Sequence, residues 1–448
     1  MASFRSAAPG DSFPPMPMLE RIYGMGVAAL RPALPLLARG EGKLARGIRG
    51  RQGVLERMEA WARAHRDPAH PLVWFHAPSV GEGLQARAVI EAFRALRPDA
   101  QVAYTFFSPS AEAFAGTVPA DFADYLPLDA SGDVRRALDT LRPAAIVFGK
   151  YDVWPILTRE AASRGVRLLL VSATLPASSG RLRGPARAVL GAAYGRLDAV
   201  AAISAEDAER FGRLGVPPER RSVMGDARFD QVWVRAAAVD RASPLLAPFA
   251  GFEGTTIVAG STWPEDERHL LPAFAALRGG GRSLRLILVP HEPTSAHLAS
   301  AEKQMEALGL RHARLSAEGA PSAEAVLVDR VGVLGELYAL ADVAWVGGGF
   351  GSAGLHSVLE PAAFGAPVLF GPRHANAREA AELVAAGGAF EVADAATADR
   401  LLAGLADVYE VRARAGRITR AYVEARLGAA ERGAELLDSI IRETLQSA

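Results

Sequence analysis

The chain repeats one pattern twice: short runs rich in β-branched and aromatic residues alternate with longer amphipathic stretches. Apolar runs separated by helical segments are typical of parallel strands that helices bury on both faces. The pattern predicts an α/β protein with two doubly wound, Rossmann-like domains facing across a cleft, with ligands at the carboxyl ends of the strands. The expected strands cover 72–76, 102–106, 145–148, 167–172, 199–203 and 222–224 in the first half, and 256–259, 284–289, 325–328, 343–346 and 367–370 in the second.

The chain has 448 residues, which is more than one hydrophobic core supports, because domains of about 100–200 residues are usual. Half of the residues are hydrophobic and 22% are charged, which is typical of globular proteins and excludes a fully disordered chain. The alternation of apolar and amphipathic segments stops between 235 and 254, where we expect a linker. The other expected parts are an N-terminal segment over 1–50, Rossmann-like domains over 51–234 and 255–430, and a C-terminal helix over 431–448.

Charge and cysteine usage exclude several classes of function. Fifty basic and fifty acidic residues balance, so the sequence does not predict nucleic-acid binding. Cysteine is absent, which excludes disulfides, thiolate metal sites, iron–sulfur clusters and cysteine nucleophiles. No His-Glu-x-x-His or comparable spacing occurs, so we expect no metal site. The Gly-x-Ser-x-Gly elbow that would indicate a hydrolase is also absent from the sequence.

The most apolar early stretch, 22–37, is about 16 residues long and is interrupted by Arg31, Pro32 and Pro35. A membrane-spanning helix needs about 20 apolar residues, and no cleavage site of a signal peptide follows. Five basic residues come next, which suits a segment lying on an anionic membrane surface. A helix that packs on the rest of the protein is the alternative. The basic residues are Arg39, Lys43, Arg46, Arg49 and Arg51.

Two strand-end loops combine glycine or hydroxyl residues with an acidic residue. Ser79 and Glu82 have the Ser-x-x-Glu spacing of a helix capping box, and Thr262 and Glu265 repeat it. A cap is the structural interpretation of each pair. Gly81 also brings backbone N–H groups to a helix N-terminus, which suits a carboxylate or phosphate, although the loop lacks the lysine of a P-loop.

The loop richest in glycine follows the expected strand 343–346 and has five glycines in the eight positions 347–354. Such a loop lets backbone approach a ligand closely. Ser357 and Glu360 again have capping-box spacing, so a structural role for Glu360 is one interpretation. The other is that Glu360 accepts hydrogen bonds from ribose hydroxyls of a nucleotide.

Several motifs in one order resemble a known family. They are WFHAPSVGEG, FFSPS, GKYDVWP, GDARFD, AGSTWPEDE, VPHEP and GGGFGSAGLHSVLEPAAFGAPVLFGP, and they are similar to motifs of the 3-deoxy-D-manno-octulosonic acid (Kdo) transferases of lipopolysaccharide biosynthesis. The resemblance implies a two-domain glycosyltransferase B architecture, the donor CMP-Kdo and a lipid A precursor (lipid IVA) as acceptor. It also implies a metal-independent enzyme without a cofactor on the cytoplasmic face of the cell inner membrane.

The resemblance also implies residue roles. Glu56, in a basic context before the first strand, matches the general base. Asp152 stands where the family usually has the Glu of Glu-Leu-Trp-Pro, and His291 stands where it usually has the Arg of Pro-Arg-His-Pro. The acceptor and Kdo-carboxylate residues are expected to be Arg51, Ser79, Gly81 and Glu82. The donor-nucleotide residues are expected to be Ser261, Thr262, His291, Gly348, Gly349, Gly351, His356, Ser357 and Glu360.

The expected reaction is a direct inversion at the anomeric carbon, in which Glu56 takes the proton of the acceptor hydroxyl. Backbone N–H groups and helix N-termini would stabilise the leaving phosphate. Two alternatives stay open: a UDP-sugar transferase or epimerase of the same architecture, and a non-catalytic nucleotide-binding module that recruits partners to the membrane.

Overall fold

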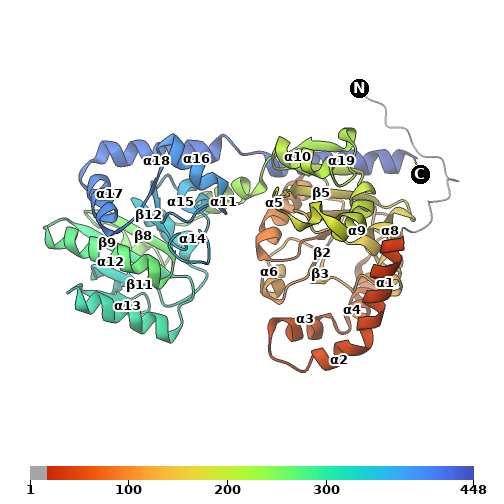
Figure 1. The fold of residues 1–448 in the computed structure, drawn as a ribbon, viewed down its shortest axis with the longest axis horizontal. Coiled ribbons are helices and arrows are strands. Elements are labelled where there is room, and N and C mark those ends of the chain that lie inside the picture. The colour runs from red at the N-terminus through yellow and green to blue at the C-terminus, as the bar shows by residue number, and fades with distance from the viewer. Residues whose placement is uncertain (1–17, 448) are drawn as a thin grey trace. The chain divides into compact units, whose positions relative to one another are not determined.

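The structure is a computed structural model that describes residues 18–447, and the chain divides into two compact units (Figure 1). Unit 1 comprises Met1–Asp230 and Gly428–Ala448, and unit 2 comprises Gln231–Leu427. Each unit contains a seven-stranded sheet whose strand pairings are all parallel. The expected class of fold, α/β with two doubly wound sheets, is confirmed.

The sheet of unit 1 has the order β3-β2-β1-β4-β5-β6-β7. The strand order reverses between β1 and β4, and in doubly wound sheets ligands bind at the carboxyl ends of the strands beside such a switch point. The strands are β1 Leu72–His76, β2 Gln101–Phe106, β3 Phe122–Tyr125, β4 Ala145–Gly149, β5 Arg167–Ala173, β6 Ala199–Ala202 and β7 Arg221–Val223.

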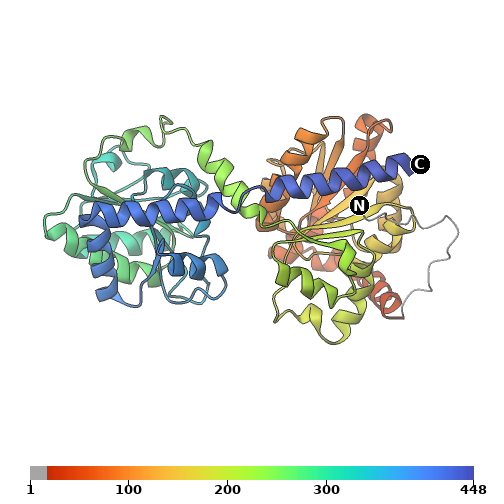
Figure 2. The same cartoon turned by 90° about the horizontal axis from the view of Figure 1, so that it is seen from above.

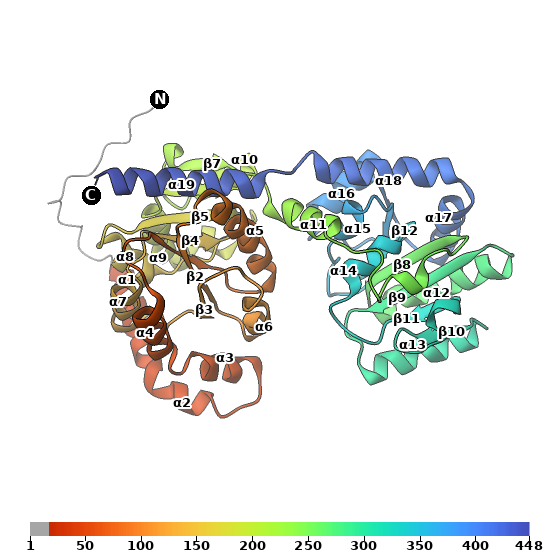
Figure 3. The ribbon, with the colours of Figure 1, turned by 180° about the vertical axis from the view of Figure 1, so that it is seen from behind.

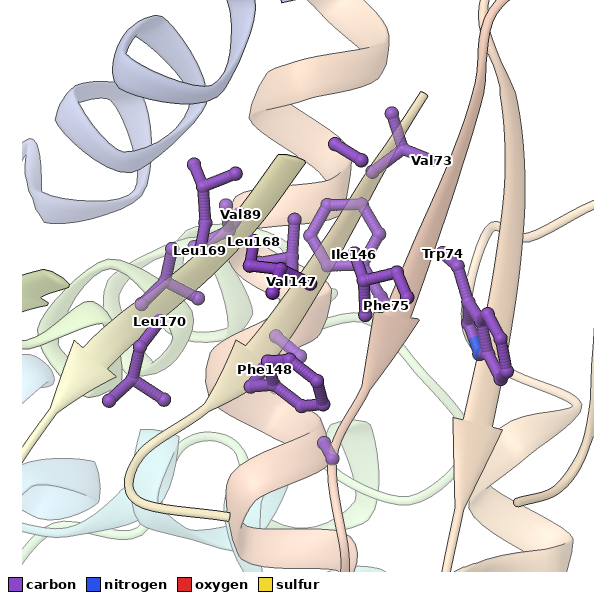
Figure 4. Close-up of a cluster of buried hydrophobic side chains, with 14 of the residues drawn as sticks. Val73, Trp74, Phe75, Val89, Ile146, Val147, Phe148, Leu168, Leu169 and Leu170 are labelled. Carbon is purple, nitrogen blue, oxygen red and sulfur yellow. The ribbon is translucent and has the colours of Figure 1, made fainter. Parts of the chain in front are cut away.

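The central strands of unit 1 are buried on both faces because apolar side chains follow one another without alternation. Figure 4 shows these side chains pointing to both faces of the sheet. The helices are α1 Met18–Leu30, α2 Leu34–Leu37, α3 Lys43–Arg51, α4 Val54–His65, α5 Val80–Leu96, α6 Glu112–Ala115, α7 Ser131–Leu141, α8 Pro155–Ala162, α9 Gly184–Gly195, α10 Ala205–Gly212, α11 Ala227–Ala237, which crosses into unit 2, and α19 Ala429–Ser447.

The last helix of the chain returns to unit 1, where it contacts α5 and β5 (the dark blue helix that ends at the label C in Figure 2). Leu437 and Ile441 of α19 are fully buried in the core of this unit. Asp230 fixes the start of the helix, because its carboxylate accepts hydrogen bonds from the backbone N–H groups of Gly428 (2.6 Å) and Ala430 (3.0 Å).

The sheet of unit 2 has the order β10-β11-β9-β8-β12-β13-β14, so its switch point lies between β8 and β12. The strands are β8 Thr255–Thr262, β9 Leu284–Pro290, β10 His312–Arg314, β11 Ala325–Leu327, β12 Val343–Val346, β13 Val368–Phe370 and β14 Ala389–Glu391. The helices are α12 Pro264–Gly279, α13 Ser295–Ala307, α14 Leu334–Leu337, α15 Leu359–Ala363, α16 Arg378–Ala386, α17 Ala395–Asp407 and α18 Tyr409–Glu424.

Two apolar clusters cover the two faces of the second sheet. Ile257 and Ala259 point to the cluster formed with α12, α13 and α17, whereas Val258 points to the other, as the alternation of side chains along a strand requires. Figure 3 shows α12 and α13 beside β9 and β11.

The segment 235–254, expected to be a linker, packs into the second core instead. Leu246 and Phe249 are 1% and 4% exposed and belong to the cluster that covers one face of the second sheet. Unit 2 accordingly comprises Gln231–Leu427, whereas the expected domain covered 255–430. It begins 24 residues earlier and ends three residues earlier than expected. The segment was expected to be a linker because it is rich in alanine and lacks a regular apolar pattern, although Leu246 and Phe249 are buried in the core.

Helices α1 to α3 pack on unit 1 through polar contacts. Glu20 is 1% exposed and forms an ion pair at 2.6 Å with Arg196, the C-cap residue of α9, and Arg31 pairs with Asp133 at 3.0 Å. Within residues 18–447 no helix is long and apolar enough to cross a membrane. The large apolar side chains of this region that remain exposed are Met18, Ile22, Met25, Leu30, Leu36, Leu37 and Leu44.

Candidate functional site

At the switch point of the first sheet, a buried histidine meets the carboxylate of Asp152. Asp152 follows β4, and its Oδ2 lies 3.2 Å from Nε2 of His76, the last residue of β1. The indole N–H of Trp154 donates to the same oxygen at 3.1 Å. The Asp152 side chain is 18% exposed, so the carboxylate is held by the protein and still reaches the solvent.

Ser79 and Glu82, expected to form a capping box or an anion site, bind each other and a lysine. The Ser79 hydroxyl donates to Glu82, and Lys150 Nζ donates to Glu82 Oε1 at 2.8 Å. The Ser79 side chain makes no hydrogen bond to the backbone of α5, so the structural cap does not form. Burial alone would raise the pKa of Glu82, but the hydrogen bonds from Lys150 and Ser79 outweigh it and lower the pKa.

Lys150 has a left-handed backbone conformation, with φ of 64°, directly after β4. Non-glycine residues seldom adopt this conformation, and it costs about 1–3 kcal/mol where it occurs. Ser261 has φ of 54° at the carboxyl end of β8 in the other unit. Strained residues thus occur next to both switch points.

We expect Lys150→Met to destabilise unit 1 by roughly 1–3 kcal/mol at pH 8, because it leaves Glu82 buried without its cation. In the wild type the pKa of Glu82 is lowered, so its contribution to stability is present above its ordinary pKa of 4.5 and is lost as the pH falls through the lowered value. The difference from the wild type should therefore persist from pH 8 to about pH 4.5 and shrink as the pH falls below that value. Denaturant unfolding across this range measures the difference, and equal stability at pH 8 would contradict the role of the pair.

Arg87→Met is the matched control for this prediction. Arg87 pairs with Glu91 on the exposed side of α5 at 2.7 Å, and exposed pairs of this kind contribute little. We expect a change within about 0.5 kcal/mol that does not depend on pH.

Arg51, expected to bind acceptor or Kdo, ends α3 and stacks on aromatic rings. Its guanidinium carbon lies 4.0 Å from the centre of the Phe107 ring, and Phe107 stacks in turn on Trp154 at 5.4 Å. Burial lowers the pKa of Arg51 to about 10. This stack connects Arg51 to the surroundings of Asp152.

Glu56 lies in the first turn of α4 and is more exposed than Asp152. Its side chain is 64% exposed, and Oε1 accepts a hydrogen bond from Arg136 at 2.9 Å. Its own backbone N–H and Arg136 together lower the pKa of the carboxylate. The next residue, Arg57, pairs with Asp124 of β3 at 2.6 Å, which places this turn beside the carboxyl end of β3.

The glycine-rich loop of unit 2 is packed against neighbouring backbone. A Cβ on Gly347 would lie 2.2 Å from the carbonyl oxygen of Ser261, and one on Gly348 would lie 2.1 Å from that of Gly354. A Cβ on Gly349 would meet Gly371 at 2.5 Å, whereas the nearest atom for Gly351 is 3.9 Å away. Close packing therefore explains why glycine stands at the first three positions, whereas a Cβ on Gly351 would have room.

The capping interaction expected from Thr262 and Glu265 is made by other residues. Asp266 Oδ2 accepts hydrogen bonds from the backbone N–H groups of Trp263 and Gly348, both at 2.9 Å, and burial raises its pKa to about 6. Thr262, fully buried, donates to Glu267 at 2.9 Å. Asp266 therefore ties the glycine-rich loop to the start of α12, and Thr262 has a structural partner.

His291 and His356, two of the residues predicted to bind the donor nucleotide, lie against each other. Their rings stack with centres 4.3 Å apart, and the indole N–H of Trp263 donates to His356 Nε2 at 3.3 Å. Burial lowers the pKa of His356 to about 4, and the neighbouring His291 adds to this effect. His356 is therefore neutral at physiological pH, with its proton on Nδ1, because an indole N–H only donates.

Glu360 pairs with a cation instead of forming a capping box with Ser357. Oε1 of Glu360 accepts a hydrogen bond from Arg235 at 3.1 Å, and the N-cap of α15 is Val358, whose side chain makes no cap. Burial raises the pKa of Glu360, and Arg235 partly offsets this. Ser357 is exposed and lies three residues before Glu360 in the chain.

Several residues of these sites were not among those expected from the sequence, including His76, Lys150, Trp154, Arg235, Asp266 and Arg373. His76 does stand at an expected strand end, which was the available signal. Arg373 follows β13, and its guanidinium donates to the carbonyl of Gly351 at 3.3 Å. In the part of the chain that the structure describes, no three His, Cys, Asp or Glu side chains gather as a metal ion would require.

Solved structures with similar folds are glycosyltransferases and epimerases. A UDP-N-acetylglucosamine 2-epimerase from Neisseria meningitidis matches with a TM-score of 0.57 and 14% identity, over 85% of this chain and 100% of that chain. A glycosyltransferase from Rickettsia africae matches with a TM-score of 0.56 and 10% identity, over 85% and 100%. The fold is that of the glycosyltransferase B class.

The sequence comparisons are more specific. The family model described as "3-Deoxy-D-manno-octulosonic-acid transferase (kdotransferase)" matches residues 52–231. The 3-deoxy-D-manno-octulosonic acid transferase of Bordetella pertussis is 32% identical over 85% of this chain and 89% of its own length, and that of Haemophilus influenzae is 26% identical over 87% and 91%. The chain belongs to the 3-deoxy-D-manno-octulosonic acid transferase family.

Proposed function

We propose that the protein transfers Kdo from CMP-Kdo to a lipid A precursor, with inversion at the anomeric carbon. The observation that carries this proposal is the 32% identity to a transferase of this name over 85% of the chain. Its second support is the set of polar groups at the carboxyl ends of the strands in each unit, where doubly wound sheets bind ligands.

For the donor, we assign the cytidylate to unit 2. Glu360 beside Arg235 suits ribose hydroxyls, and the exposed His291 with the Nδ1–H of His356 suits the phosphate. The backbone N–H of Gly348 already binds Asp266, so Gly349 and Gly351 are better candidates for the leaving phosphate. Ser261 stands next to this loop, since its carbonyl lies against Gly347.

For the acceptor, we assign the sugar hydroxyl and the Kdo carboxylate to unit 1. Glu56 is the proposed base: it removes the proton of the acceptor hydroxyl as the hydroxyl oxygen bonds to the anomeric carbon and CMP leaves with the electron pair of the broken bond. We propose that Asp152 contacts the acceptor. Arg51, Lys150 and the N-terminus of α5 at Gly81 are the groups that we assign to binding the Kdo carboxylate and the other anionic groups of the substrates.

We also propose that the protein lies on the cytoplasmic face of the inner membrane through α1 to α3. These helices attach to unit 1 through Glu20 and Arg31, which leaves seven large apolar side chains outward. Arg39, Lys43 and Arg46 are exposed beside them, as an anionic surface would favour.

The triple variant Met25→Glu, Leu36→Glu and Leu44→Glu should bind vesicles containing anionic lipid at least about tenfold more weakly than the wild type. Burying one such side chain contributes about 1.5–3 kcal/mol, and each 1.4 kcal/mol is a factor of ten. Vesicle sedimentation measures the binding. Val331→Glu, on an equally exposed apolar residue of unit 2, is the control, and an equal loss in both variants would contradict the assignment.

The test of the proposed function is incubation of the full-length protein with CMP-Kdo, generated in place, and tetraacylated lipid A precursor. Mass spectrometry should show acceptor heavier by one or more whole Kdo units. A protein that binds CMP but yields no such product would instead be the non-catalytic nucleotide-binding module.

A further inference from the structure

A chain of hydrogen bonds runs from the interior of unit 1 to Asp152. The indole N–H of Trp74 donates to Thr105 Oγ1 at 2.9 Å, and the same oxygen lies 3.1 Å from His76 Nδ1. His76 Nε2 then lies 3.2 Å from Asp152 Oδ2. Trp74, Thr105 and His76 are at most 1% exposed, so water cannot replace any link without moving the core.

Two donor–acceptor arrangements of His76 fit its partners. Nε2 lies 3.2 Å from both Asp152 Oδ2 and the indole nitrogen of Trp154, which itself lies 3.1 Å from Asp152 Oδ2. An ionised carboxylate only accepts hydrogen bonds, so a proton on Nε2 binds Asp152, and the indole N–H then donates to the carboxylate alone. In that neutral ring Nδ1 has no proton, and the hydroxyl of Thr105 donates to it. With the proton on Nδ1 instead, Nε2 accepts from Trp154 and does not bind Asp152.

The same chain also accommodates a doubly protonated ring. Nδ1–H would then donate to Thr105, whose hydroxyl proton turns to the carbonyl oxygen of Phe75 at 3.4 Å. Trp74 donates to Thr105 in both cases. Each polar side-chain atom of this chain keeps a partner in either state, so a change in the charge of the ring leaves none of them unsatisfied.

Asp152 is also fixed from its other side. Trp154 is the N-cap residue of α8, and the first amides of that helix, Ile156 and Leu157, donate to the buried carboxylate of Asp129 at 3.0 and 2.8 Å. The position of the indole is therefore set by the helix start, and that of the imidazole by β1 and β2.

We propose that His76 is a positioning residue for Kdo transfer, which holds Asp152 in one orientation through Nε2–H while the hydroxyl of Thr105 holds Nδ1. The inference rests on the proposed function, in which Asp152 contacts the acceptor. It goes further because it assigns His76 and Thr105 to the reaction although neither touches substrate.

The first test compares steady-state kinetics of His76→Gln, Asp152→Asn and the double variant of the full-length protein. We expect kcat to fall about 10²-fold in His76→Gln, with KM for CMP-Kdo within about twofold, because a carboxylate misplaced by about 1 Å costs this much. If His76 acts through Asp152, the double variant should be no slower than Asp152→Asn. Multiplied effects, or wild-type kcat in His76→Gln, would overturn the inference.

Variants of Thr105 distinguish an effect of the hydrogen-bond chain from an effect of core packing. Thr105→Val keeps the shape and removes the hydroxyl, so we expect a loss of kcat, whereas Thr105→Ser should restore it. Thermal melts identify variants that do not fold, and His65→Gln, on an exposed histidine of α4, is the control with unchanged activity. Equal activity of the Val and Ser variants would overturn the role of Thr105.

The third test does not depend on turnover. Nitrogen-15 NMR of the histidine rings should show His76 of the wild type protonated on Nε2, with a changed signal in Asp152→Asn. A proton on Nδ1 alone would overturn the inference even if Kdo is transferred, because Nε2 could not then donate to Asp152. Absence of Kdo transfer by the wild type would instead contradict the proposed function.

Discussion

Glu56→Gln should lower the rate of Kdo transfer by about 10²–10⁴-fold, the usual contribution of a positioned general base. The amide keeps the size of the side chain and can still meet Arg136, so the fold of α4 should be unchanged. CMP affinity should also stay within about twofold, because we assign the cytidylate to the other unit. Turnover of CMP-Kdo with the acceptor at saturation measures the effect.

Glu59→Gln is a close control for this prediction. Glu59 lies on the same helix, three residues on, and accepts a hydrogen bond from the same Arg136 at 2.9 Å. Loss of the ion pair is thus common to both variants, and only loss of the base is specific to Glu56. Equal rates in the two variants would contradict the assignment of Glu56.

Gly348→Ala should weaken CMP binding by about 10- to 100-fold. Its φ is 91°, and a Cβ would lie 2.1 Å from the carbonyl oxygen of Gly354, so the loop must move. Such overpacking costs about 1–3 kcal/mol, and each 1.4 kcal/mol is a factor of ten in affinity. The displacement also breaks the hydrogen bond from Gly348 to Asp266. Isothermal titration with CMP measures the loss.

Gly404→Ala is the control for the backbone argument. Gly404 lies in α17, and a Cβ added there would have no atom within 4 Å, so alanine should stabilise unit 2 by about 0.5–1 kcal/mol and leave CMP affinity unchanged. Normal CMP binding by Gly348→Ala would show that the glycine-rich loop is not part of the nucleotide site.

The class of fold was predictable because central parallel strands are apolar on both faces. The expected strands at 72–76 and 343–346 coincide with β1 and β12. The strands β3, β10 and β14 were missed, and each has only three or four residues with at least one side chain outside the core. Short strands that lie at or near an edge of a sheet lack a continuous apolar run.

The partners of the site residues were less predictable than the site residues themselves. Three Ser/Thr-x-x-Glu spacings indicated capping boxes, yet Glu82 binds Lys150, 68 residues away, and Glu360 binds Arg235, 125 residues away. Local spacing predicts a cap only when no cation from another segment competes for the carboxylate. His76 was visible at a strand end, but its link to Asp152 depends on the pairing of β1 with β4.

The central claim is that this chain selects a cytidylate-activated Kdo, and a donor comparison tests it most directly. Purified protein is given lipid A precursor with either CMP-Kdo or UDP-N-acetylglucosamine, and the products are weighed by mass spectrometry. The account predicts Kdo-bearing acceptor from the first donor and unchanged acceptor and sugar nucleotide from the second. Conversion of the UDP-sugar with no Kdo product would contradict it, and would favour an epimerase or UDP-sugar transferase of the same fold.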